Sequence, residues 1–247
     1  MKITGNTILI TGGGSGIGRA LAEAFLAKGN DVIVTGRNRD RLRQVEKANP
    51  GIHARQLDVD DPDAISAFSR LIVQDFPALN VLVNNAGIMR AETVEDGTTA
   101  TAEATITTNL LGPIRLTSAL LPHLMSRPAA AVLTVSSGLA FLPRAAFPTY
   151  CATKAAIHSY SQSLRAQMRG TPVQVIELAP PYVQTELTGP QQASDPNAMP
   201  LSDYISETMA LLEKDADADE ILVERVHFLR FAEREGRYEE SFARLNG

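Results

Sequence analysis

The chain has 247 residues, of which 44% are hydrophobic and 21% charged, and its formal net charge is −5. A length of about 250 residues suits one α/β domain with a sizeable core, so residues 1–247 are predicted to form a single domain. The acidic balance and the scattered basic residues argue against nucleic acid or an anionic membrane as partner. The one cysteine, Cys151, permits no internal disulfide. No signal-peptide pattern and no apolar run of roughly 18 residues occurs, so a cytoplasmic location is expected.

Short runs rich in Val, Ile and Leu alternate with longer stretches of helical periodicity. Strands are predicted at residues 7–11, 31–35, 52–57, around 81–83, 130–135 and 173–178. Helices are predicted over residues 17–28, 39–48, 62–76 and 150–168. Continuously apolar strands separated by helices favour a parallel sheet covered on both faces. The predicted fold is therefore an α/β, doubly wound, Rossmann-like sheet, which binds ligands at the carboxyl ends of its strands.

The turn after the first predicted strand is rich in glycine and reads Thr-Gly-Gly-Gly-Ser-Gly-Ile-Gly over residues 11–18. A pyrophosphate can approach the backbone closely only where no side chain intervenes, and the helix start that follows favours the anion. Glycine also occurs in such turns for geometry alone, but its place after the first strand favours a dinucleotide site. The residues predicted to bind the cofactor here are Gly12, Gly14, Ser15, Gly16, Ile17 and Gly18.

The second predicted strand ends in Gly36 and Arg37, where an acidic residue would bind the ribose hydroxyls of NAD. An arginine at this place can accommodate the 2′-phosphate of NADP, and Arg39 is a candidate helper. Alternatively, Arg37 is a solvated surface charge. The predicted cofactor is therefore NADP, with NAD as the alternative.

Tyr150 and Lys154 lie four residues apart in a predicted helix, so their side chains share one helix face. A free phenol has a pKa of about 10, and a nearby cation stabilises the phenolate, which makes tyrosine a usable acid or base. Tyr-x-x-x-Lys also occurs by chance on surface helices. Here, however, Ser137 and the run 84–87 each follow a predicted strand, and Asn109 precedes Gly112-Pro113 in a helical stretch.

Together these motifs closely resemble the short-chain dehydrogenase/reductase family over about residues 5–187. Within that family, the sequence resembles a bacterial subgroup named after a protein of a lipoteichoic-acid D-alanylation operon. The resemblance implies that Tyr150 donates or accepts the proton and that Lys154 lowers the pKa of Tyr150 and bonds the nicotinamide ribose. It also implies that Ser137 polarises the carbonyl and that Asn109 holds a water linking Lys154 to solvent. A bond within its own helix is the alternative for Asn109.

The same resemblance implies further contacts with the cofactor. These come from Asp58, which would approach the adenine, and from Val59, Asn85, Ala86, Gly87, Tyr150, Lys154, Pro180, Val183 and Thr185. Asn85 is also a candidate for tying neighbouring strands together.

The sequence departs from the family pattern at three places. Ser15 stands where many NADP-dependent members carry a basic residue, and Pro181 stands where many members have glycine. The usual last strand, ending in Asp-Gly-Gly, is absent, and residues 219–234 and 237–245 are predicted to form charged amphipathic helices. We therefore predict six strands and a helical C-terminal extension. Because the family's tetramer often uses that last strand, a homodimer is predicted, through the two long helices before strand five and after Tyr150, with a homotetramer as the alternative.

Residues 188–202 are rich in Pro, Gly, Ser and Asn and follow the sixth predicted strand, so they are predicted to form a lid over the substrate. An ordinary surface loop is the alternative. The predicted substrate wall is apolar and consists of Ile88, Met89, Leu139, Phe141, Phe147, Tyr182 and Met199. The four histidines show no metal-ligand spacing, so no metal is predicted.

These features predict an NAD(P)H-dependent oxidoreductase that interconverts a small hydrophobic ketone or aldehyde and its alcohol. A catalytically idle nicotinamide-binding sensor is one alternative, because a fold does not determine a function. A reductase of carrier-bound 3-oxoacyl chains is another, although this acidic chain offers no obvious basic docking patch.

Overall fold

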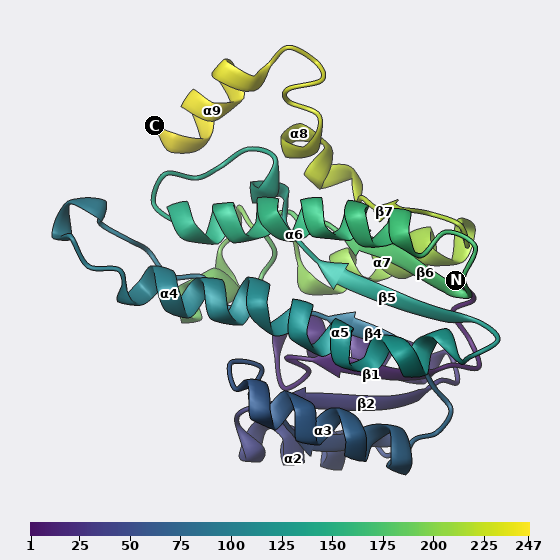
Figure 1. Cartoon of the computed structure of the whole chain (residues 1–247). Coiled ribbons are helices and arrows are strands. Elements are labelled where there is room, and N and C mark those ends of the chain that lie inside the picture. Colours follow the sequence, from purple (N-terminus) through teal and green to yellow (C-terminus); the bar gives the residue numbers. More distant parts are fainter.

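The structure is a computed structural model that describes all 247 residues. Its centre is one parallel sheet with the strand order β3-β2-β1-β4-β5-β6-β7 (Figure 1). The strands are β1 (Thr7–Thr11), β2 (Asp31–Gly36), β3 (Ile52–Gln56), β4 (Leu79–Asn84), β5 (Ala130–Val135), β6 (Val173–Leu178) and β7 (Glu220–Ile221). The order reverses between β1 and β4, so the sheet is doubly wound, as predicted, and has its switch point beside the glycine-rich turn.

Helices cover both faces of the sheet (Figure 1). They are α1 (Gly16–Ala27), α2 (Arg39–Ala48), α3 (Pro62–Asp75), α4 (Ala100–Ile106), α5 (Gly112–Met125), α6 (Pro148–Gln167), α7 (Leu201–Lys214), α8 (His227–Arg230) and α9 (Tyr238–Asn246). Local signals set several boundaries. Asn38 caps α2 by accepting a hydrogen bond from the Arg41 amide, and Asp61 caps α3 ahead of Pro62.

Two apolar clusters form the core, one on each face of the sheet. Side chains of α1 and α7, among them Phe25 and Tyr204, pack on one face. Side chains of α3, α5 and α6, among them Ile72 and Leu120, pack on the other. Neighbouring residues of β1 divide between the two clusters, with Ile8 in the first and Leu9 in the second. Both faces of each central strand are thus buried, which explains the continuous apolar runs of the sequence.

The prediction of six strands was wrong, because a seventh, β7, pairs with β6 in the register Glu177↔Glu220 and Leu178↔Ile221. Most of the predicted helix 219–234 is absent as well. β7, a single 3-10 turn and the four-residue α8 occupy this segment. Ile221, Val223 and Val226 are all buried, so packing against the sheet overrides the helical periodicity. The last predicted helix, by contrast, is confirmed as α9.

None of the helices has both the length and the apolar character needed to cross a membrane.

Candidate active site

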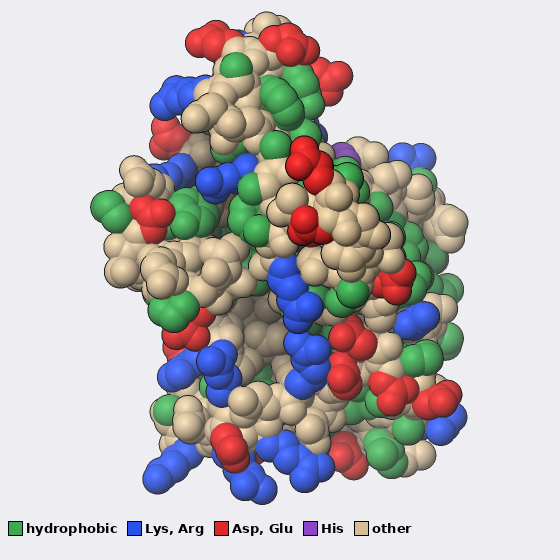
Figure 2. Space-filling model, turned by 90° about the vertical axis from the view of Figure 1, so that its left-hand side faces the viewer, with side chains coloured by type: hydrophobic (Ala, Val, Ile, Leu, Met, Phe, Trp, Pro, Cys, Tyr) green, Lys and Arg blue, Asp and Glu red, His purple; other side chains and the backbone are tan.

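A cavity of about 640 Å³ opens at the carboxyl ends of the central strands. The loops after β1, β2, β4, β5 and β6 all contribute to its lining, as does the start of α6. Figure 2 shows this side of the molecule hollowed, with basic side chains beside the hollow. The cavity lies at the switch point, where open α/β sheets bind ligands.

The glycine-rich turn packs too closely against the loop after β4 for side chains at two positions. A Cβ on Gly18 would lie 2.3 Å from Nδ2 of Asn85 and 2.5 Å from the Gly12 carbonyl oxygen. A Cβ on Gly12, whose φ is +68°, would lie 2.9 Å from the Ala86 Cα. A Cβ on Gly14 would make only ordinary van der Waals contact, because its nearest neighbour, Cβ of Arg41, would be 3.6 Å away. Of the predicted phosphate-loop residues, Gly12, Ser15, Gly16 and Ile17 line the cavity, whereas Gly14 and Gly18 do not.

Thr11 and Asn85 join the loops after β1 and β4. The Thr11 Oγ1 accepts hydrogen bonds from the backbone amides of Asn85 and Ala86, each at 3.0 Å. The Asn85 Nδ2 donates to the Thr11 carbonyl at 2.9 Å. These bonds give Asn85 a structural contact, while Asn85, Ala86 and Gly87 also line the cavity. Thr11 is the first residue of the glycine-rich motif, but the sequence did not indicate that its side chain joins the two loops.

One end of the cavity, beyond the glycine-rich turn, is basic. Arg37 lines it and makes a long ion pair of 3.4 Å with Asp60. Arg39 donates to Gln56 instead and does not line the cavity, whereas Arg41, which the sequence did not single out, does. Of the two cofactor contacts predicted after β3, Val59 lines the cavity, whereas Asp58, the predicted adenine contact, does not. The Asp58 carboxylate accepts a hydrogen bond from the Asp60 amide at 3.1 Å.

Tyr150, Lys154 and Ser137 converge on the cavity between β5 and α6. Tyr150 and Lys154 are 6% and 5% exposed. The Lys154 Nζ lies 5.6 Å from the centre of the Tyr150 ring and donates to the Val135 carbonyl at 2.7 Å. Ser137 is hydrogen-bonded to Tyr150 and also accepts from the Leu139 amide. A phenol, a hydroxyl and an ammonium thus share one wall of the cavity.

Burial dominates the acid–base properties of this wall. Burial raises the pKa of Tyr150 to about 12, against the opposing effect of its hydrogen bond with Ser137. Burial lowers the pKa of Lys154 to about 8, against the opposing effect of the Glu177 carboxylate. At neutral pH Tyr150 therefore carries its proton, as a general acid must.

Asn109 lies behind this wall and not in the cavity lining. It belongs to a π-helical segment, Thr107–Leu111, between α4 and α5. Its carboxamide exchanges two hydrogen bonds with the backbone of Ile88, at 2.8 and 2.9 Å, and donates to the Thr153 Oγ1 at 3.3 Å. The side chain thus links the loop after β4 to α6 and makes no hydrogen bond within its own helix. Such π-helical turns occur often at functional sites.

The sequence profile described as short chain dehydrogenase matches residues 6–196. The chain belongs to the short-chain dehydrogenase family. The predicted family, the oxidoreductase class and the doubly wound fold are thereby confirmed.

Two relatives and one solved structure illustrate the similarity. The chain is 43% identical over 251 residues to DltE of Bacillus subtilis, called an uncharacterized oxidoreductase, with 100% of this chain and 98% of DltE covered. It is 34% identical over 198 residues to sulfoacetaldehyde reductase of Chromohalobacter salexigens, covering 76% and 78%. The closed form of serine dehydrogenase complexed with NADP+ has a TM-score of 0.78 and 26% identity, covering 87% of this chain and 93% of that one.

The segment after β6 shows how this dehydrogenase accommodates Pro181 where many family members have glycine. Pro180, Pro181, Val183 and Thr185 all line the cavity. The Gly138 amide donates to the Pro180 carbonyl at 2.8 Å, which ties the segment to the loop after β5. This hydrogen bond fixes the backbone beside the cavity, although Pro181 stands in place of glycine.

The substrate end of the dehydrogenase cavity differs in part from the prediction. Ile88, Met89, Leu139, Phe147 and Tyr182 line it, as predicted. Phe141 and Met199 do not. The Phe141 ring packs against His158 and Arg230, with ring-to-ring and ring-to-guanidinium distances of 4.7 and 4.4 Å, and Met199 belongs to the core.

Three lining residues at this end were not part of the predicted wall: Leu229, Leu245 and Arg144. Leu229 lies in α8 and Leu245 lies in α9. The Asn246 side chain accepts from the Ala145 amide and donates to the Pro143 carbonyl, which fixes α9 against the loop before α6. The C-terminal segment therefore forms part of the substrate wall. Only its amphipathic pattern was visible in the sequence.

Proposed function

We propose that the protein is an NADP(H)-dependent oxidoreductase that interconverts a hydrophobic ketone or aldehyde and its alcohol. One observation carries the proposal: Tyr150, Ser137 and Lys154 share a wall of the same cavity whose other end holds the glycine-rich turn and Arg37. A proton donor and a dinucleotide cradle thus open into one space. This is the arrangement that hydride transfer to a carbonyl requires.

The turn fits a dinucleotide because Gly12, Ser15 and Gly16 line this end of the cavity with no bulky side chain between the backbone and a bound pyrophosphate. The cavity-lining residues that would hold the cofactor are Gly12, Ser15, Gly16, Ile17, Arg37, Val59, Asn85, Ala86, Gly87, Tyr150, Lys154, Pro180, Val183 and Thr185. Gly14, Gly18 and Asp58 lie outside the lining and would act through the conformation of the loops that carry them. When bound, the nicotinamide supplies or accepts the hydride.

The protein's own side chains move and hold the proton. Tyr150 donates its phenolic proton to the carbonyl oxygen in reduction and takes it back in oxidation. The Ser137 hydroxyl bonds the same oxygen and orients the carbonyl. The Lys154 ammonium binds the ribose and stabilises the phenolate that Tyr150 leaves behind. Asn109 holds the loop after β4 against α6 beside Lys154, where it supports a proton path to solvent.

NADP is proposed over NAD because two arginines, Arg37 and Arg41, line the end of the cavity where the second strand terminates. The serine dehydrogenase to which the chain is similar was solved with NADP+. The lining at the other end is mostly apolar, with Leu139, Phe147 and Leu245 among its residues, which supports a hydrophobic carbonyl substrate. NAD remains the alternative cofactor.

The test is the oxidation of NADPH and of NADH, followed separately, against a panel of aryl and alkyl ketones, aldehydes and keto esters. The panel includes anionic members such as sulfoacetaldehyde, because Arg144 lines the cavity, with its guanidinium 5.8 Å from the centre of the Phe147 ring. Turnover of neutral hydrophobic carbonyls with NADPH supports the proposal. Cofactor binding without turnover of any carbonyl would favour an idle sensor, and turnover of carrier-bound 3-oxoacyl chains alone would favour the carrier reductase.

A further inference from the structure

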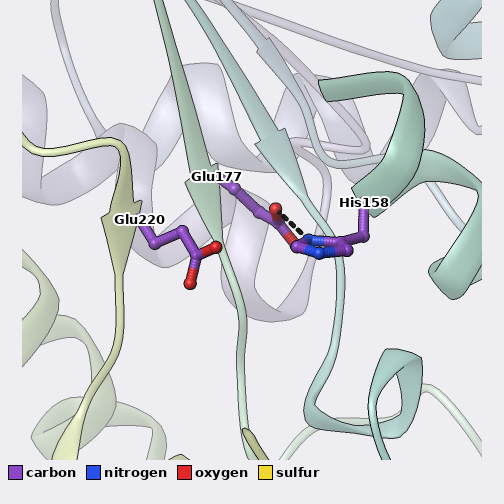
Figure 3. A group of neighbouring side chains, drawn as sticks. All are labelled: His158, Glu177 and Glu220. Atoms are coloured by element: carbon purple, nitrogen blue, oxygen red, sulfur yellow. Dashed lines mark hydrogen bonds and ion pairs between the residues drawn. The ribbon is translucent and has the colours of Figure 1, made fainter. Parts of the chain in front are cut away.

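A group of ionisable side chains, one buried and two partly buried, lies next to the candidate active site, on the side away from the glycine-rich turn. His158, Glu177 and Glu220 come from α6, β6 and β7, and atoms of all three lie within 4.8 Å of one another. Figure 3 shows His158 and Glu220 on opposite sides of Glu177. The fold creates this group, because the register pairs Glu177 directly with Glu220 on the neighbouring strand. Parallel register partners present their side chains on the same face of a sheet.

The two carboxylates differ in how well their charge is compensated. Glu220 receives two hydrogen bonds from the Arg230 guanidinium, at 2.9 and 3.1 Å. Glu177 is 0% exposed, and its only partner is the His158 Nδ1, 2.7 Å from Oε2. The other oxygen of Glu177, Oε1, is buried without any hydrogen-bond partner. A buried carboxylate oxygen left unpaired is costly and requires an explanation.

Lys154 is the buried cation on which the Glu177 charge acts, although no direct ion pair joins the two side chains. It lies one helical turn before His158, so the two side chains share the face of α6 that packs on the sheet. Its Nζ donates to the Val135 carbonyl, at the end of β5, and β5 pairs with β6 in the register Thr134↔Glu177. The ammonium, which has three protons to donate, makes this one hydrogen bond within the protein. A buried cation bonded to the end of β5 and a buried anion near the end of β6 therefore each have bonding capacity unused.

We propose that Glu177 is a positioning residue for the catalytic lysine: its buried carboxylate, anchored by His158, keeps Lys154 protonated inside the active site. The role in turnover rests on the proposed function, but the charge state of Lys154 does not. Burial disfavours the ammonium, and a fixed negative charge nearby opposes that effect. The Glu177 carboxylate acts on Lys154 in this direction.

The other ionisable groups around Lys154 do not provide the same effect. Tyr150, on α6, is neutral at physiological pH because burial raises its pKa. On β7 and α8, Glu220 and Arg230 neutralise each other. His158, on α6, carries at most a positive charge and cannot favour a second cation. Glu177, on β6, is thus the carboxylate of this group that is bonded to no lysine or arginine, and His158 is its only hydrogen-bond partner.

A divalent metal ion is the competing occupant, because one histidine and two carboxylates are common metal ligands. The contacts favour the charge network instead. Arg230 already holds the Glu220 carboxylate with two bonds and would repel a cation placed beside it. The two negative charges of the carboxylates are matched by the positive charges of the Arg230 guanidinium and the Lys154 ammonium, so no metal ion is needed to balance the charge.

The test is an NMR pH titration of the ligand-free protein labelled with carbon-13 at the lysine Cε, with the Lys154 signal assigned by its absence in Lys154→Arg. We expect Glu177→Gln to lower the Lys154 pKa by about one unit, a tenfold change in the ionisation constant. Glu220→Gln makes the same chemical change on the register partner and should leave the Lys154 pKa nearly in place. An unchanged titration in Glu177→Gln would overturn the proposal.

Should Glu177→Gln fail to fold, Glu177→Asp provides a second test, because it keeps the negative charge on a side chain that is shorter by one methylene. Glu177→Asp should lower the Lys154 pKa by less than Glu177→Gln does. An unchanged Lys154 pKa in Glu177→Asp would also contradict the proposal. Zn²⁺ that binds the wild type saturably, but not Glu177→Gln or His158→Gln, would replace the charge network with a metal site.

A second readout follows turnover. The carbonyl-reducing kcat/KM should begin to fall at lower pH in Glu177→Gln than in the wild type or Glu220→Gln, because Lys154 loses its proton earlier. A shifted lysine titration without turnover of any carbonyl would refute the proposed function and leave this inference standing. Turnover of a carbonyl together with an unshifted lysine titration would support the proposed function and refute this inference.

Discussion

At the scale of single residues, Tyr150 bears the proposed proton transfer, since its phenol is the ionisable group hydrogen-bonded to Ser137 in the cavity wall. Tyr150→Phe removes only the hydroxyl and should leave NADPH affinity nearly unchanged. We expect kcat to fall by about a hundredfold or more, the scale of general acid catalysis. Steady-state kinetics together with NADPH fluorescence titration would measure both. Activity within a few-fold of wild type would contradict the role given to Tyr150.

Arg37 tests the choice of cofactor. Its side chain lines the cavity with a weak, largely exposed ion pair to Asp60, so it is available for a 2′-phosphate. Arg37→Asp should shift the preference from NADPH towards NADH, because a carboxylate repels the phosphate and can bond the free ribose hydroxyls. The measurement is the ratio of kcat/KM for the two cofactors. Arg39→Asp serves as the control, since Arg39 bonds Gln56 outside the cavity, and an equal shift in that variant would refute the argument.

Gly18 and Gly14 form a matched pair for the packing of the glycine-rich turn. Gly18→Ala places a Cβ against backbone atoms of the turn and should destabilise the fold by about 1–3 kcal/mol, the usual cost of overpacking. Gly14→Ala adds the same methyl group at an ordinary van der Waals distance from its neighbours and should leave the stability close to that of the wild type. Urea unfolding of the two ligand-free variants compares them. Equal urea midpoints for the two variants would show that the structure relieves the close contact at Gly18 without loss of stability.

At the scale of elements, residues 188–202, which follow β6 and reach the start of α7, are the proposed lid. Thr188 and Gln192 of this segment line the cavity, and Pro190–Ser194 form a 3-10 turn. Gln192 anchors the segment: its side chain donates to the Val183 carbonyl at 2.8 Å and accepts from the Thr188 amide and hydroxyl. The predicted loop is therefore partly ordered, and one buried glutamine carries much of that order.

If residues 188–202 close over the ligands, NADPH plus a carbonyl substrate should slow limited proteolysis within them. Gln192→Ala removes the anchor and should make cleavage faster in the ligand-free protein. Mass spectrometry of the fragments locates the cuts. Identical cleavage rates with and without both ligands would reduce the segment to an ordinary surface loop.

At the scale of the whole molecule, we predict a homodimer through α5 and α6, whose length and neighbouring positions offer an extended surface (Figure 1). The edge strand β7 has only two residues and is followed by the C-terminal segment, which disfavours pairing of two sheets at that edge. Light scattering should give a mass about twice the 26.6 kDa of one chain. Hydrogen exchange should be slowest on the exposed faces of α5 and α6. A monomer, or a tetramer protected at β7 instead, would contradict this arrangement.

The sequence by itself determined the local features of this protein and the order of its motifs. The strands β1, β2, β5 and β6 and the helix α6 were predictable because each has its own periodicity and flanking signals. Tyr150 and Lys154 could be paired for the same reason, since a four-residue spacing on one helix places side chains together wherever the helix packs. The glycine-rich turn was recognisable because its conformation depends on neighbouring residues.

The tertiary structure decided the contacts between distant residues. β7 exists because β6 offers an unpaired edge, although the residues around it have a helical pattern. Leu229 and Leu245 reach the cavity, and Phe141 leaves it, because the C-terminal segment folds back onto the loop before α6. Glu177 meets His158 and Lys154 only through the packing of α6 on the sheet. Such neighbours are set by how elements pack, which no spacing along the chain encodes.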